Sequence, residues 1–143
     1  MELPVQFEKA QERRLALQDA LTALERALAM ASSSPAWRST VTRALVEVHT
    51  AIEAHVDEVE ANDGLLAQLV SDAPRLSNLV RILERDHHRL LDACDEIISV
   101  ASGADASEIR SMARDLMGDL VDHRQQGADL VYAAYSEDIG GQA

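Results

Sequence analysis

Hydrophobic residues recur along this chain at spacings of three and four, which is the period of a helix with one buried face. This pattern predicts four long helices and one short helical turn; the long helices cover about 6–31, 35–61, 73–101 and 106–136, and the turn about 65–70. No stretch alternates as a half-buried strand does. Long amphipathic helices with short links pack by default as an up-down-up-down four-helix bundle, so we expect an all-α fold.

The breaks between the predicted helices carry turn and capping residues. Asn62-Asp63-Gly64 is expected to end the second long helix. Ser34 is expected to cap that helix at its start, with Pro35 in the first turn. In the same way, Asp72 is expected to cap the third long helix, with Pro74 in the first turn.

Composition supports helices and narrows the choice of partners. Hydrophobic residues make up 47% of the chain but aromatic residues only 3%, so the core consists mostly of Leu, Ala, Val and Ile, which suits helices better than a β-sandwich. A length of 143 residues corresponds to one domain, 1–143. The net charge of −12 and the lack of a Lys/Arg cluster argue against nucleic acid and an anionic membrane as partners. A protein partner or a homodimer stays open.

The chain also lacks the marks of secretion and of common enzyme classes. Its N-terminus has no cleavable apolar segment and no apolar run is long enough to span a membrane, so we expect a cytoplasmic protein. Cys94 is the one cysteine, which excludes an internal disulfide, and it lies on a buried stripe where a thiol is usually inert. There is no nucleophile elbow or Gly-rich phosphate loop, so a conventional hydrolase or transferase is not favoured.

Three histidines occupy hydrophobic-stripe positions on three different predicted helices. They are His55, His87 and His123. At 1.5 Å per residue, they lie ~30, ~21 and ~27 Å along the bundle from the same end, and boundary errors of ~3–6 Å make one shared layer compatible with these heights. An inward imidazole needs a polar partner, and the simplest partner for three of them is a metal ion.

Other ionisable residues are weaker candidates for this layer. His49 and His88 each follow a stripe residue and are expected on the flank or surface, although His88 replaces His87 if its helix is rotated. Acidic residues that share a face with the inward histidines are candidate ligands, and the competing interpretation for each is a solvated surface charge. These acidic candidates are Glu58, Glu84 and Asp119.

The segments Asp86-His87-x-x-Leu90 and His55-Val-Asp-Glu-Val-Glu60, followed by His123, resemble the hemerythrin-like, HHE cation-binding family. The resemblance spans nearly the whole chain and implies a four-helix bundle that holds non-haem iron. In that family the iron sites bind oxygen, sense redox state or handle nitric oxide, iron or peroxide. The resemblance matches His55, His87 and His123 to the histidines of the second, third and fourth helices of the family.

The chain departs from the family pattern at three places. Val59 and Gly127 stand where the second and fourth helices of the family carry an acid. The first helix has no histidine, and near the expected layer it offers Arg14, Gln18 and Asp19.

Two functional hypotheses follow. In the first, His87 and His123 ligate one iron, His55 ligates the same or a second iron, and Glu58 or Glu60 bridges or closes the site, which then binds a diatomic or peroxide ligand. In the second, a degenerate hemerythrin-like bundle binds no metal and serves as an interaction or regulatory module, with the histidines in a hydrogen-bonded buried layer. Whether the protein is an enzyme stays open.

Overall fold

The computed structural model describes residues 4–141, with side chains described for 4–136, and every regular element in this range is helical. The elements are α1 (Val5–Ala29), α2 (Trp37–Val59), α3 (Leu65–Asp72), the 3-10 turn η1 (Pro74–Leu76), α4 (Ser77–Val100) and α5 (Ala106–Gly141). The predicted all-α class is confirmed. No helix within the described range is long and apolar enough to cross a lipid bilayer.

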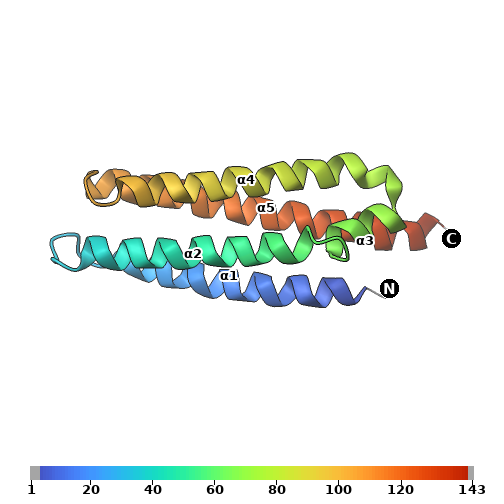
Figure 1. Cartoon of the computed structure of the whole chain (residues 1–143), viewed down its shortest axis with the longest axis horizontal. Coiled ribbons are helices and arrows are strands. Elements are labelled where there is room, and N and C mark those ends of the chain that lie inside the picture. Colours follow the sequence, from blue (N-terminus) through green and yellow to red (C-terminus); the bar gives the residue numbers. More distant parts are fainter. Residues whose placement is uncertain (1–3, 142–143) are drawn as a thin grey trace.

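The four long helices run along a common axis as two helical hairpins (Figure 1). One hairpin pairs α1 with α2 and the other pairs α4 with α5, and α2 packs beside α4. The short helix α3 lies at the end of the bundle opposite the two hairpin loops and joins α2 to α4 (Figure 1). This arrangement places the middle of α2, α4 and α5 around a shared interior.

Both predicted caps are wrong. α2 begins at Trp37 and has Ala36 at its N-cap without a side-chain hydrogen bond, because the backbone N–H of Trp37 already donates to the Ser34 carbonyl oxygen at 3.1 Å. Asp72 is the last residue of α3 rather than a cap of α4. Its carboxylate instead accepts a hydrogen bond from the Tyr135 hydroxyl at 2.8 Å.

Pro74 opens the separate 3-10 turn η1, and α4 follows directly at Ser77. The proline thus precedes the long helix rather than lying in its first turn. At the other end of the chain, α5 continues to Gly141, past the predicted end near 136.

The turn between α2 and α3 requires a glycine. A Cβ on Gly64 would lie 2.5 Å from the carbonyl oxygen of Glu58 and 2.9 Å from that of Val59. Those separations are far inside van der Waals contact, so a side chain at this position would push the turn away from the end of α2. The close approach lets α3 fold back so that its Leu65, Leu66 and Leu69 are buried.

The hydrophobic core consists of two separate clusters. The loop-end cluster lies toward the two hairpin loops and includes Leu24, Trp37, Leu45, Ile52, Leu90, Cys94, Ile109 and Leu120. The α3-end cluster lies toward α3 and includes Val59, Leu65, Leu69, Leu76, Val80, Leu83 and Leu130. Along α2, α4 and α5, the residues that fall between the two clusters are the three inward histidines. The core is therefore interrupted by one polar layer.

Candidate metal site

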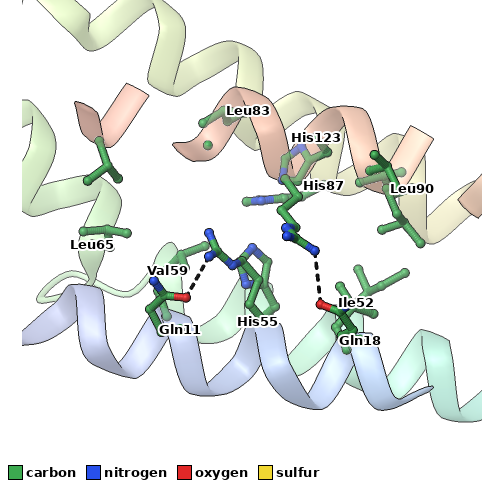
Figure 2. Close-up of a pocket in the computed structure, with 18 of the residues that line it drawn as sticks. Gln11, Gln18, Ile52, His55, Val59, Leu65, Leu83, His87, Leu90 and His123 are labelled. Atoms are coloured by element: carbon green, nitrogen blue, oxygen red, sulfur yellow. Dashed lines mark hydrogen bonds between the residues drawn. The ribbon is translucent and has the colours of Figure 1, made fainter. Parts of the chain in front are cut away.

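His55, His87 and His123 meet in one layer of the bundle. The ring centroids are 5.5 Å apart for His55 and His87, 6.3 Å for His55 and His123, and 4.7 Å for His87 and His123. Each ring offers one nitrogen that lies within 4.8 Å of those offered by the other two. The predicted shared layer is confirmed, and Figure 2 shows the three rings pointing into one cavity.

The helix periods explain why these rings face inward. His87 stands seven residues after Val80 and seven before Cys94, both buried, and its own exposed fraction is only 2%. Its neighbour His88 is exposed, so the structure decides between the two histidines in favour of His87. His123 has 11% of its side chain exposed, and His55 is half-buried at the wall of the cavity.

Burial keeps the three rings neutral. It lowers the pKa of His55 and of His87 to about 3, and in both cases repulsion from neighbouring histidines adds to the effect. Burial also lowers the pKa of His123, while the nearby Asp86 carboxylate acts in the opposite direction. At neutral pH each ring therefore carries one proton and one free lone pair, which is the form that ligates a metal.

Two carboxylates support the rings from outside the cavity. The Nδ1 of His87 lies 2.8 Å from Oε2 of Glu60 and donates a hydrogen bond to it in the neutral ring. That bond leaves Nε2 of His87 with the lone pair. The Nδ1 of His123 lies 3.6 Å from Oδ2 of Asp86, which is close enough for electrostatic attraction but too far for a hydrogen bond. Carboxylates placed in this way orient metal-ligating histidines in many proteins.

Two ring nitrogens in this layer are buried without a hydrogen-bond partner. They are Nδ1 of His55 and Nδ1 of His123, and neither donates or accepts a hydrogen bond among the described residues. Leaving a buried polar nitrogen unpaired costs about 1–3 kcal/mol, so such atoms in a native core call for a ligand or another partner. The Nδ1 of His123 faces Asp86 outside the cavity, so the unpaired Nδ1 of His55 is the atom that calls for a ligand within the layer.

A single metal ion fits the three rings. Histidine nitrogens bind zinc and similar ions at about 2.0–2.1 Å, so nitrogens up to 4.8 Å apart require only small side-chain rotations to reach one ion. Three neutral imidazoles suit iron, zinc, copper or nickel rather than magnesium or calcium, which prefer oxygen ligands. Among the described residues, no other group of three or more histidine, cysteine or acidic side chains lies close enough together to hold an ion.

The acidic candidates take different positions. Glu60 contacts the outer nitrogen of His87, so in this geometry it supports a ligand rather than serving as one. Glu58 is half-buried and has no hydrogen bond or ion pair to the histidines among the described residues. Glu84 is also half-buried and interacts with Glu60. The expectation that Asp119 faces inward is wrong, because its side chain is exposed to solvent. It precedes His123 by four residues, slightly more than one helical turn, and therefore lies off the inward face.

Several residues outside the histidine layer behave as expected. The position predicted for His49, on the flank or surface of its helix, is confirmed: its partly exposed ring is paired with Glu53 at 2.9 Å and with Asp95 at 3.1 Å. Cys94 is fully buried, its Sγ donates to the Leu45 carbonyl oxygen at 3.4 Å, and burial raises its thiol pKa to about 12. These residues take no part in the site.

The three rings form part of the wall of a cavity with a volume of about 190 Å³, which we call the histidine cavity. A single water needs roughly 10–15 Å³, so the space accommodates a small molecule. Hydrophobic side chains from all the helices line most of it, including Leu65 and Leu83 on one side of the rings and Ile52 and Leu90 on the other (Figure 2).

Sequence reasoning missed two features of this cavity. Arg14 and Gln18, seen in the sequence only as residues near the expected layer, line the cavity from α1, whereas the neighbouring Asp19 is exposed. Arg124 lines it from α5. The only sequence signal for Arg124 is its position directly after His123, and that signal says nothing about the helix that it faces.

Comparisons with protein-family models, curated proteins and solved structures found no match. The hemerythrin-like resemblance therefore stands on the residues of this chain, and the geometry of the site carries the functional conclusion.

Proposed function

We propose that this chain is a metal-binding protein that holds one first-row transition-metal ion, with iron favoured, through His55, His87 and His123. The observation that carries the proposal is the convergence of three neutral imidazoles, with His87 buried and the other two partly buried, whose ligand nitrogens lie within 4.8 Å of one another. The unpaired Nδ1 of His55 adds support, because a ligand in the layer compensates for its burial.

One ion is favoured over a di-iron centre. The three histidines form a single cluster, and Glu60 is engaged by the outer nitrogen of His87. Val59 and Gly127 take the two positions where the hemerythrin-like family has its bridging acids. We infer a hemerythrin-like bundle in which the ligand set is reduced to three histidines, with the alternating helix directions of Figure 1 as support for the family topology.

Three protein ligands leave open coordination positions on the ion. An ion of this kind supplies Lewis acidity and, in the case of iron, redox chemistry toward oxygen, nitric oxide or peroxide. The chain would then bind or sense such a small ligand, since the adjoining cavity gives the ligand room. A cytoplasmic location and a protein partner or homodimer stay predictions.

A second candidate is a metal-free interaction or regulatory module. The hydrogen bond between His87 and Glu60 favours it, because it shows that one histidine is satisfied by the protein alone. In this alternative the histidine layer is a buried polar network that specifies the packing of the helices.

Elemental analysis after expression in iron-supplemented cells separates the two candidates. We expect bound metal in the wild type and in His49→Ala, and loss of metal in the triple variant His55→Ala/His87→Ala/His123→Ala. A ligand that binds only the native state raises stability by RT ln(1 + [L]/Kd), so added Fe(II), Mn(II) or Zn(II) should raise the Tm of the metal-free wild type. No metal in the purified protein together with no Tm change for any of the three ions would favour the metal-free module.

A further inference from the structure

Two arginines line the histidine cavity without a carboxylate partner. Arg14 of α1 donates to Oε1 of Gln11 at 2.7 Å, and Arg124 of α5 donates to Oε1 of Gln18 at 3.1 Å (Figure 2). Both acceptors are neutral amides. Within the part of the chain that the structure describes, neither guanidinium forms an ion pair, although the chain has 25 acidic residues and only 13 Lys and Arg.

The two guanidinium groups lie close enough to repel each other. Burial lowers the pKa of Arg14, and the positive charge of Arg124 lowers it further. The positive charge of Arg14 also lowers the pKa of His55, so this charge lies near the histidine layer. Two like charges next to one cavity, without a fixed counter-charge, attract an anion into the space between them.

The acidic residues near the site do not neutralise this pair. Glu60 and Asp86 contact the outer sides of the histidine rings and do not line the cavity. Among the described residues, Glu25 is the single acidic residue that lines the histidine cavity. Glu25 stands eleven residues after Arg14 on α1, a rise of ~16 Å along the helix. The polar centre of the cavity is therefore cationic.

The remaining walls are apolar and the cavity has an open side. The hydrophobic lining includes Phe7, Leu66, Leu21, Leu90, Leu120 and Leu130. The mouth lies between α1 and α5, because Gln18, Val121 and Arg124 line the cavity and are also exposed to solvent. An inorganic anion would supply the counter-charge for the arginines but would leave the apolar walls in contact with water. A neutral apolar molecule would cover the walls but leave the guanidinium groups without a counter-charge.

We propose that the histidine cavity binds a medium-chain fatty acid. Its carboxylate lies between Arg14 and Arg124, where each guanidinium can donate two parallel hydrogen bonds, and its alkyl chain lies along the leucine-rich wall. This inference goes beyond the proposed metal function and does not require it, because both arginines are charged whether or not a metal is present.

Isothermal titration calorimetry with three probes tests the proposal on the full chain. Octanoate has both the charge and the chain, octanol has the chain alone, and acetate has the charge alone. We expect octanoate to bind at least about tenfold more tightly than either, since charge-assisted hydrogen bonds and apolar burial contribute separately. Octanol binding as tightly as octanoate, or acetate binding as tightly, would overturn the proposal.

Matched variants locate the carboxylate. Arg14→Gln and Arg124→Gln should each weaken octanoate binding by about tenfold, the factor expected for one lost charge-assisted interaction. Arg114→Gln removes an exposed arginine of α5 outside the cavity and should leave the affinity unchanged. Arg14→Lys should keep part of the affinity, because it keeps the charge. Wild-type affinity in Arg14→Gln/Arg124→Gln would contradict the proposal.

The titrations are run after chelator treatment and again after loading with Zn(II), which keeps this test separate from that of the metal site. Octanoate binding in both states supports the fatty-acid site even if elemental analysis finds no native metal. Absence of octanoate binding in both states, alongside a Tm increase with Zn(II), overturns the fatty-acid site and leaves the metal proposal standing. Circular dichroism of each variant establishes that the helical fold is retained.

Discussion

Glu60 and His87 join the end of α2 to the middle of α4 through a single hydrogen bond of 2.8 Å between Oε2 and Nδ1. The two residues are 27 positions apart in the chain. His87 is almost fully buried, whereas Glu60 keeps 22% of its side chain exposed. The bond fixes the orientation of the ring and leaves its other nitrogen directed to the remaining histidines, so Glu60 influences the site without lying in it.

Removal of Glu60 should weaken metal binding more than it weakens the fold. Outer partners of metal-ligating histidines typically contribute about 10–100-fold in metal affinity, so we expect Glu60→Ala to raise the Kd for Zn(II) by a factor in that range. Competition with a chromophoric chelator measures the change. Glu58→Ala is the matched control two residues earlier, and an equal loss there would show that the effect is not specific to the His87 contact.

The metal-free protein should lose stability as the pH falls from about 6.5 toward 3. The folded-state pKa values of His55 and His87 are about 3, below the ordinary value of about 6.5, so the unfolded chain binds more protons within this window. The free energy of unfolding therefore rises with pH there, by about 1.4 kcal/mol per pH unit for each histidine.

Urea unfolding of chelator-treated protein at several pH values between 4 and 7 checks this slope. Carboxylates also titrate in acid, so the comparison is made with His87→Gln, which removes one titrating ring. We expect the slope of the variant to be smaller than that of the wild type by about 1.4 kcal/mol per pH unit. Identical slopes would mean that His87 is protonated in the folded protein at the same pH as in the unfolded chain.

Substitution of Gly64 should destabilise the protein and disturb the site. The new Cβ in Gly64→Ala would lie 2.5 Å from the Glu58 carbonyl oxygen, and backbone at such a contact must shift. We expect a loss of about 2–4 kcal/mol in the free energy of unfolding. Metal affinity should fall as well, because the shift displaces the segment that carries Glu60.

Gly118→Ala is the control for this substitution. A Cβ at Gly118 meets nothing within 4 Å, and the residue lies inside α5. Because alanine favours a helix over glycine, this variant should gain about 0.5–1 kcal/mol. Thermal unfolding followed by circular dichroism measures both variants, and equal Tm values for them would contradict the steric role of Gly64.

Cys94 should be unreactive in the folded protein. Its thiol is fully buried, with a pKa raised to about 12 by burial, so almost no thiolate is present at neutral pH. An aromatic disulfide reagent should label it on mixing in guanidinium chloride but not during the same time in native buffer. Rapid native labelling would require that the loop-end cluster opens readily around α4.

Hydrophobic periodicity was enough to predict the helices and two of the inward histidines, His55 and His123. The three- and four-residue spacing sets which side chains share a face of one helix, and that geometry is local, but the rotation of α4 in the packed structure decided between His87 and His88. The fixed rise per residue made one shared layer of His55, His87 and His123 compatible with the predicted helix bounds. Helix ends were less predictable, because backbone turns satisfied the groups that Ser34 and Asp72 were expected to cap.

The tertiary structure alone decided which groups surround those rings. Glu60 meets His87, Asp86 meets His123, and Arg14 comes close to Arg124 only because packing sets the rotation and spacing of neighbouring helices. The sequence determines which side chains each helix presents on each of its faces, because backbone hydrogen bonds between nearby residues fix the helical period. Distances between helices depend on how many side chains throughout the core fit together, and no local spacing encodes that fit.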